Sequence, residues 1–256
     1  MKIYENSVVV KTDSLAGGIY EMYIETVVAK YSKPGQFVMV YPTDSATILP
    51  RPISICEVIG GKVLRLVYRV QGKGTKEFST YRPGDEVRVM GPLGNGFPVE
   101  EASGKRVLLI GGGIGVPPIL ELSKKLRKEN VTILAGYRND DLFLNKDFKK
   151  YAPLEIATED GSVGVHGNVM DIIREKGLEC DVIYACGPMP MLRAIKKYAE
   201  ENNIKAYISL EERMACGVGA CLGCVCKTVK KDAHSHVNNA RVCTEGPVFE
   251  AGEVDI

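Results

Sequence analysis

The sequence predicts a chain of three units: an antiparallel β barrel, an α/β domain with a parallel sheet, and a small cysteine-rich C-terminal lobe. Three observations predict this division. Short strands separated by turn residues fill the first 100 residues, strands then alternate with helices up to residue 209, and five of the eight cysteines follow residue 215. We therefore expect the units to span residues 1–100, 101–209 and 210–256.

The first unit consists of short segments rich in β-branched and aromatic residues. Turn sequences such as Lys33-Pro34-Gly35 and Arg82-Pro83-Gly84-Asp85 separate them, and these residue types favour turns. Short strands at this spacing are typical of a small antiparallel barrel. The expected strands are 8–11, 20–26, 36–41, 53–58, 63–70 and 86–90, with a helix over 75–81.

The second unit begins with a continuous apolar run at 107–110, followed by a glycine loop and a helix with apolar residues at helical spacing. Strands that alternate with helices predict a parallel α/β sheet, typical of a nucleotide-binding domain. Further strands are expected at 131–135, 154–157, 182–185 and 206–209, and further helices at 169–176 and 190–202.

Three loops follow strands of this sheet and should meet at its carboxyl edge, where such folds bind ligands. In the first, Gly111, Gly112, Gly113 and Gly115 can present backbone N–H groups to a pyrophosphate at a helix N-terminus. The other two are Cys186-Gly187-Pro188 and the loop around Asp160. Taken singly, each loop has an ordinary alternative. The glycine loop can be a tight turn, Cys186 a buried thiol, and the loop around Asp160 a solvated turn.

The third unit contains the run Cys216-x4-Cys221-x2-Cys224, with Cys243 downstream. This is the ligand spacing of plant-type [2Fe–2S] ferredoxins. Intervening glycines allow a tight loop to approach the inorganic sulfides closely. We therefore predict a [2Fe–2S] cluster held by Cys216, Cys221, Cys224 and Cys243.

Two other uses of the cysteines remain open on the sequence alone. A disulfide framework is disfavoured because the N-terminus lacks the apolar segment of a signal peptide. Structural zinc is a stronger alternative, since His234 and His236 lie nearby, but zinc sites usually pair two C-x2-C motifs. Cys226 is the doubtful fifth cysteine, and a small buried thiol is its simplest role.

Composition excludes several classes of function. The net charge of +1 gives no nucleic-acid-binding signature. No apolar run approaches the roughly 18 residues that a membrane span needs. Clustered cysteines in a chain with no expected secretion signal indicate the reducing cytoplasm.

The segment Arg51-Pro52-Ile53-Ser54 lies in the predicted barrel. Its arginine can pair with phosphate and its serine can hydrogen-bond a planar ring. Followed by the glycine loop and Cys186-Gly187-Pro188, it resembles the ferredoxin–NADP reductase superfamily. With the cysteine loop and the segment 241–249 added, the whole chain resembles the electron-transfer subunits of class B dihydroorotate dehydrogenases.

This resemblance implies FAD on the barrel, NAD on the α/β domain and the cluster in the lobe. It implies that the nicotinamide stacks on the flavin near Cys186, Ser54 and Asp160. Asp140 and Asp141 favour NAD over NADP, since a carboxylate can bind the ribose 2′-OH, whereas Arg138 favours a 2′-phosphate. The resemblance assigns these further residues to flavin binding: Tyr68, Arg69, Val70, Gly74 and Thr75.

Two cofactor sites and a cluster are expected, but no site that oxidises a substrate. A partner is therefore expected, and the resemblance implies that it is an FMN-containing dihydroorotate dehydrogenase catalytic subunit, in a heterotetramer with two copies of each chain. Apolar residues of the lobe then either shield the cluster or meet the partner: Met214, Val218, Leu222 and Phe249. The alternatives are a subunit of a sulfite reductase, hydrogenase or transhydrogenase, or a metal-stabilised module without catalysis.

Overall fold

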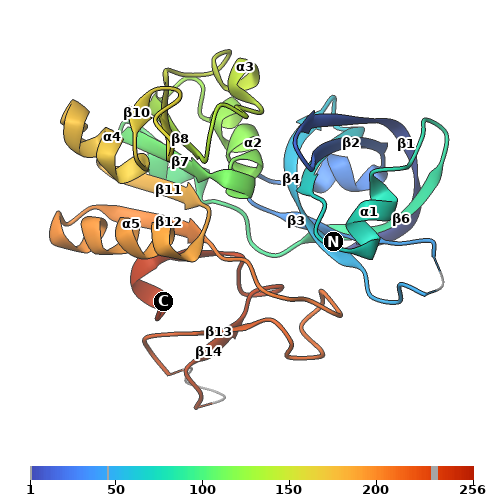
Figure 1. Cartoon of the computed structure of the whole chain (residues 1–256). Coiled ribbons are helices and arrows are strands. Elements are labelled where there is room, and N and C mark those ends of the chain that lie inside the picture. Colours follow the sequence, from blue (N-terminus) through green and yellow to red (C-terminus); the bar gives the residue numbers. More distant parts are fainter. Residues whose placement is uncertain (1, 45, 232–235) are drawn as a thin grey trace.

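The structure is a computed structural model that describes residues 2–44, 46–231 and 236–256. His234 lies outside these residues. Figure 1 shows a barrel on the right, a layered α/β unit on the left and a C-terminal lobe below them. Among the helices of the described residues, none is both long enough and apolar enough to cross a bilayer.

Six antiparallel strands close into the barrel in the order β1-β2-β5-β4-β3-β6. Its interior is filled by apolar side chains that alternate with outward-facing residues, as the period of a strand requires. The strands and the one α-helix of this unit are β1 (Ile3–Ala16), β2 (Ile19–Glu25), β3 (Phe37–Tyr41), β4 (Arg51–Ile59), β5 (Val63–Arg69), α1 (Lys73–Phe78) and β6 (Glu86–Leu93).

Several boundaries differ from the sequence expectation, among them those of the first strand and of the helix, which ends at Phe78. The first strand is longer than 8–11 because β1 pairs along its length with both β2 and β6. The helix expected at 75–81 begins at Lys73, since the Thr75 hydroxyl accepts the backbone N–H groups of Gln71 (3.0 Å) and Gly72 (3.2 Å) and so closes its first turn.

The α/β unit contains a seven-stranded sheet in the order β10-β9-β8-β7-β11-β12-β15. All strand pairs are parallel except β12 with β15. The strands are β7 (Arg106–Gly112), β8 (Asn130–Tyr137), β9 (Leu154–Thr158), β10 (Val165–His166), β11 (Val182–Cys186), β12 (Lys205–Ser209) and β15 (Val248–Glu250).

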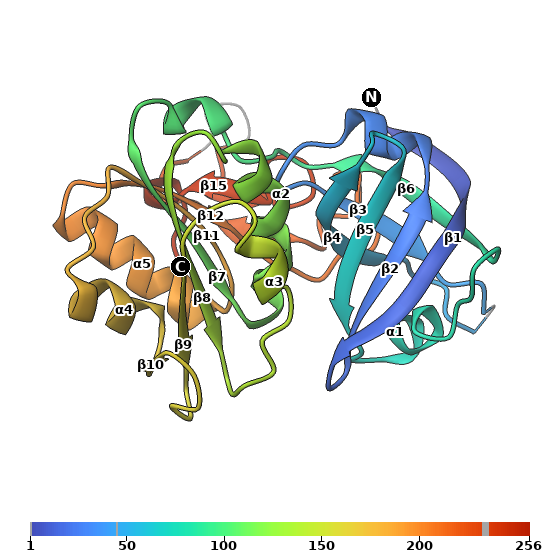
Figure 2. The same cartoon turned by 90° about the horizontal axis from the view of Figure 1, so that it is seen from above.

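Helices cover both faces of this sheet (Figure 2). One face packs against α2 (Pro117–Lys125) and α3 (Asn145–Phe148), and the other against α4 (Val169–Lys176) and α5 (Met189–Glu201). Helix α2 also lies beside β4, where Val58 N–H donates to the buried Glu121 carboxylate at 2.9 Å. The barrel and the sheet therefore share a packed boundary.

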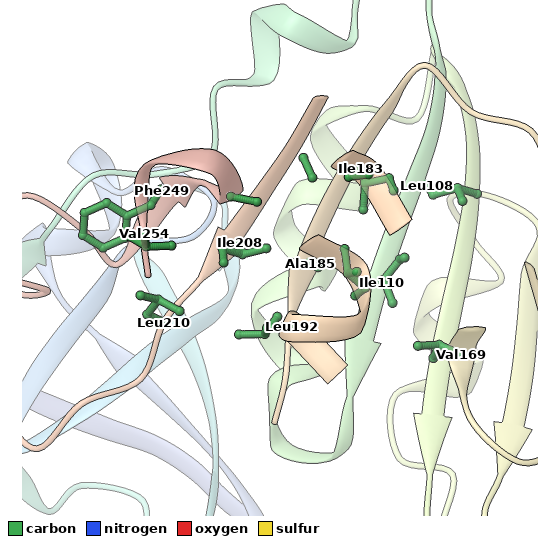
Figure 3. Close-up of a cluster of buried hydrophobic side chains, with 14 of the residues drawn as sticks. Leu108, Ile110, Val169, Ile183, Ala185, Leu192, Ile208, Leu210, Phe249 and Val254 are labelled. Atoms are coloured by element: carbon green, nitrogen blue, oxygen red, sulfur yellow. The ribbon is translucent and has the colours of Figure 1, made fainter. Parts of the chain in front are cut away.

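The end of the chain returns to the sheet, which the sequence pattern did not indicate. Phe249 and Val254 pack near Ile208 and Leu210 in the main core cluster (Figure 3). Since β15 pairs with β12, the cysteine-rich segment between them is fixed to the sheet at both of its ends.

The cysteine-rich segment is mostly irregular and includes one small hairpin, β13 (Val225–Lys227) with β14 (Asn239–Arg241). Gly217 and Gly219 have φ values of 68° and 86°, a region that favours glycine. Short 3-10 helices complete the described structure at Val27–Tyr31, Val99–Ala102, Gly113–Gly115 and Ala251–Glu253.

Candidate functional site

The strand order has its switch point at the carboxyl ends of β7 and β11. Strand β7 has β8 on one side and β11 on the other. The chain adds β8, β9 and β10 on one side of β7 and then crosses to add β11 and β12 on the other side. In open α/β sheets, ligands bind at such a switch point. The loops that leave these two strands are Gly111–Gly115 and Cys186–Pro188, both predicted from the sequence.

Close packing between these loops requires glycine. A Cβ atom on Gly115 would lie 2.4 Å from the carbonyl oxygen of Cys186, and one on Gly112 would lie 2.6 Å from Met191 Sδ. Burial raises the pKa of the Cys186 thiol to about 12, so this group stays neutral at physiological pH. The two loops therefore meet closely, beside a neutral thiol.

Asp160 lies apart from these two loops. It follows β9, which is separated from β11 by β8 and β7. Three strand spacings of about 4.8 Å give roughly 14 Å. Asp160 is exposed, and hydrogen bonds from the Ser162 hydroxyl and backbone N–H lower its pKa. The structure therefore brings together the glycine and Cys186 loops, but not the Asp160 loop with Cys186.

On the barrel, Arg51 and Gly74 lie next to each other although they are far apart in the sequence. A Cβ atom on Gly74 would lie 3.1 Å from Arg51 Nε, and Arg51 Nη1 donates to the carbonyl oxygen of Leu49 at 2.5 Å. Thr75 closes the turn that contains Gly74. A guanidinium beside a glycine turn is a suitable place for a phosphate group.

Tyr68 offers a second observation that fits a ligand. Its side chain is buried, and among the described atoms its hydroxyl has no hydrogen-bond partner. Burial raises the pKa of Tyr68, which keeps the hydroxyl protonated and able to donate. The next residue, Arg69, has a guanidinium nitrogen 3.9 Å from the Cβ position of Gly113. Strand β5 therefore connects the barrel site to the glycine loop, and Val70 follows it.

The flavin motif lies on the strand that faces the α/β unit. Pro52 and Ser54 are half-buried on β4, whereas Ile53 points into the barrel core. Farther along the same strand, Glu57 accepts a hydrogen bond from Lys124 of α2 at 3.0 Å. The exposed edge of Ser54 therefore belongs to the boundary between the two units.

In the lobe, the four predicted ligand cysteines form two pairs. Cys221 N–H donates to Cys216 Sγ at 3.4 Å, and the Cys243 side chain interacts with that of Cys224. The second pair is buried, whereas Cys221 is exposed. Among the described residues, no three His, Cys, Asp or Glu side chains are grouped around one point as a single metal ion requires. Two pairs that lie near each other, with Cys243 also close enough to Cys216 to feel its charge, fit a two-iron cluster with four cysteine ligands.

Cys216 and Cys243 differ in how readily their thiols ionise. Burial opposes ionisation of Cys216, but N–H groups of Val218 (3.5 Å) and Cys221 (3.4 Å) hold its pKa at about 6. Burial and the neighbouring Cys224 raise the pKa of Cys243 to about 11. A metal must therefore displace a proton from Cys243, and metal binding commonly does this.

Cys226 and His236 lie outside both pairs. Cys226 is on β13, opposite Ala240, and burial raises its pKa. His236 is exposed. Of the four apolar residues expected to shield the cluster or meet a partner, Val218 and Leu222 are exposed by 40% and 60%, while Met214 and Phe249 pack against the core.

A junction that the sequence pattern did not indicate ties the lobe to the loop between the other two units. Asn95 Nδ2 donates to the carbonyl oxygen of Glu245 at 2.8 Å, and Asn95 N–H donates to that of Gly246 at 2.6 Å. A Cβ atom on Gly94 would lie 2.4 Å from Pro247. The segment directly after Cys243 is thus attached to the barrel.

Comparisons with known proteins agree with this arrangement. Residues 211–255 match the family described as the iron–sulfur cluster binding domain of dihydroorotate dehydrogenase B. The solved structure of an NADH-dependent reduced ferredoxin–NADP oxidoreductase superposes with a TM-score of 0.84 at 26% identity, over 97% of this chain and 89% of that chain. The FAD/NAD-binding domain of a Vibrio cholerae nitric oxide dioxygenase shares the fold, with a TM-score of 0.68 at 19% identity over 80% of this chain and 98% of that chain.

Similarity to curated relatives extends over the full length of the chain. The dihydroorotate dehydrogenase B (NAD(+)) electron transfer subunit of Bacillus cereus (strain AH187) is 45% identical over 257 residues, covering 98% of both chains. A subunit of the same name from Bacillus anthracis (strain CDC 684 / NRRL 3495) matches equally well, at 45% identity and 98% coverage of each chain. The chain therefore belongs to the family of dihydroorotate dehydrogenase B electron transfer subunits.

Proposed function

We propose that this chain carries electrons between NAD and a partner subunit, through FAD on the barrel and a [2Fe–2S] cluster in the lobe. The observation that carries the proposal is the contact between the cysteine loop and the barrel: a Cβ atom on Gly217 would lie 2.8 Å from Met39, the residue paired with Pro52 of the flavin motif. When bound, a flavin can take up a hydride and release electrons singly, as an iron–sulfur cluster requires.

The protein's own residues hold and orient these groups in the proposal. Arg51 and the turn at Gly74 and Thr75 bind flavin phosphate, while the Tyr68 hydroxyl donates to the flavin. Backbone N–H groups of Gly111–Gly115 and Cys186–Pro188 bind the dinucleotide. The nicotinamide lies between Ser54 and Cys186, and Asp160 contacts a more distant part of the dinucleotide. No residue of this site needs to act as an acid or a base.

We further propose that the partner is an FMN-containing subunit that oxidises dihydroorotate, in a cytoplasmic heterotetramer with two copies of each chain. The exposed Cys221 and its exposed apolar neighbours Val218 and Leu222 support docking on this side of the lobe. A redox partner must approach the cluster closely, and apolar surface beside the exposed cysteine suits a protein contact. The cytoplasm keeps the cluster thiols reduced.

Anaerobic spectroscopy tests the proposed relay in the isolated chain. The purified protein should show flavin and iron–sulfur absorbance together, and both should bleach on addition of NADH. Dihydroorotate alone should change neither. A colourless protein that contains zinc in place of iron would contradict the proposal.

Replacing Arg51 with alanine is expected to weaken flavin binding. The guanidinium lies beside Gly74, and a charge-assisted hydrogen bond to phosphate contributes about 1.5–3 kcal/mol. Flavin retained after gel filtration should fall, and heat-released flavin from the unaltered chain should be FAD by chromatography. Arg82→Ala, in an exposed turn of the barrel, is the control. Recovery of FMN alone would contradict the assignment.

A preference for NADH over NADPH is expected. Asp140 and Asp141 are exposed directly after β8, next to the glycine-loop strand, where a carboxylate binds a ribose 2′-OH and repels a 2′-phosphate. Arg138, also exposed, acts in the opposite direction. The measurement is kcat/KM for each nucleotide with an artificial acceptor. A higher value for NADPH would show that Arg138 dominates.

A further inference from the structure

Strand β3 has two different faces. Val38 and Val40 point into the barrel core, whereas Met39 points outward and is fully buried in the cluster that also contains Cys224 and Cys243. The period of two along a strand produces this alternation. Met39 is therefore a barrel residue whose side chain is buried in the cluster that joins the α/β unit and the lobe.

The cysteine loop rests on Met39 without an intervening side chain. Gly217, directly after Cys216, has φ of 68°, and a Cβ atom there would lie 2.8 Å from Met39 Cγ and 3.2 Å from Leu93 Cδ1. A contact below 3.0 Å requires a shift, so a side chain at position 217 would displace either the loop or Met39, and the positive φ disfavours it further. The loop backbone is thus in direct contact with β3.

The other neighbour of Met39 is the flavin motif. Met39 is paired with Pro52, and Phe37 is paired with Ser54. Side chains of directly opposed residues in an antiparallel pair lie on the same face, about 5 Å apart. Pro52 and Met39 therefore share the outer face of the barrel, and Met39 lies between the flavin motif and the first cysteine of the loop.

We propose that Met39 is a positioning residue that sets the spacing between flavin and cluster and fills the path between them. This inference rests on the proposed function. A flavin bound at the proposed site would take up both electrons of the NADH hydride, and the cluster of the same chain would accept one of them, the second staying on the flavin until an acceptor reoxidises the cluster. No atom is transferred between the two groups in the electron step, so at a given driving force its rate depends on their separation and on the packing of the intervening atoms.

Stopped-flow mixing with NADH under anaerobic conditions separates the two steps by wavelength. In Met39→Ala, iron, sulfide and flavin contents should equal those of the unaltered chain, and flavin reduction should keep its rate. Cluster reduction should be at least several-fold slower, because the truncation leaves a void in which no atoms connect the two sites. Met39→Leu, which keeps the volume, should restore the rate.

Met22→Ala is the matched control, since Met22 is equally buried but points into the barrel core away from the lobe. It should leave both steps unchanged. Equal cluster reduction in Met39→Ala and the unaltered chain would overturn the inference, as would equal slowing by Met22→Ala. If Met39→Ala loses iron while Met22→Ala keeps it, the inference is also overturned, because Met39 would then serve to support the cysteine loop. Failure of flavin reduction in the unaltered chain would instead contradict the proposed function.

Discussion

Serine at any one of positions 216, 221, 224 and 243 is expected to abolish the iron–sulfur cluster, whereas Cys226→Ser is expected to retain it. The thiolate is the ligand that iron requires, and the structure groups these cysteines as two interacting pairs. Cys226 lies outside both pairs, on the β13–β14 hairpin. Iron and acid-labile sulfide per chain, measured after anaerobic purification, distinguish the five variants.

The same variants should loosen the lobe without unfolding the rest of the chain. Metal binding supplies folding free energy to small metal-stabilised units, but Phe249 is also held on the sheet by the pairing of β15 with β12, where it lies opposite Ile208. Limited proteolysis should therefore cleave between residues 211 and 245 in the four ligand variants and spare the sheet. If Cys226→Ser loses iron while Cys243→Ser keeps it, the ligand assignment is wrong.

Replacing Arg65 with methionine is expected to destabilise the whole protein by about 3–5 kcal/mol, the cost of removing one partner from a buried ion pair. Arg65 on β5 bonds Glu21 of β2 at 2.7 Å and Asp147 of α3 at 2.9 Å. Its side chain is only 7% exposed and that of Glu21 6%. The variant leaves the buried Glu21 carboxylate to the exposed Lys11 at 3.5 Å, and Asp147 to Lys150 at 2.7 Å, at the boundary between barrel and α/β unit. Chemical denaturation measures the fall in the free energy of unfolding.

Arg174→Met provides the control for this prediction. Arg174 pairs with Asp171 at 2.8 Å on the surface of α4, and its side chain is 71% exposed. Exposed pairs contribute about 0–1 kcal/mol, so this variant should unfold close to the unaltered chain. An equal fall in the free energy of unfolding for Arg65→Met and Arg174→Met would show that the buried ion-pair network does not hold the two units together.

The elements with clear periodicity were predictable from the sequence. Short alternating strands indicated the barrel, and continuous apolar runs followed by helices indicated the parallel sheet, because burial of one or both faces of an element determines its residue pattern. Strand β15 was missed since three residues, Val248–Glu250, carry no measurable period. It exists because β12 has an unpaired edge that this segment covers.

The candidate site was predictable where its chemistry is local in the sequence. The cysteine spacing and the glycine loop each lie in one short segment, so residue types alone indicated their use. Contacts between distant segments were not accessible: the packing of Gly217 on Met39 and the bonds from Asn95 to the segment after Cys243 depend on how three units meet. For the same reason, the sequence could place Asp160 at the sheet edge but not show its separation from Cys186.

Coupling to the partner tests the proposed electron relay most directly. The measurement is NADH formation from dihydroorotate and NAD by an FMN-containing dihydroorotate-oxidising subunit, with and without this chain. We expect NADH only when both chains are present, and none from this chain alone. The relay is contradicted if addition of this chain makes no difference, or if this chain oxidises dihydroorotate unaided.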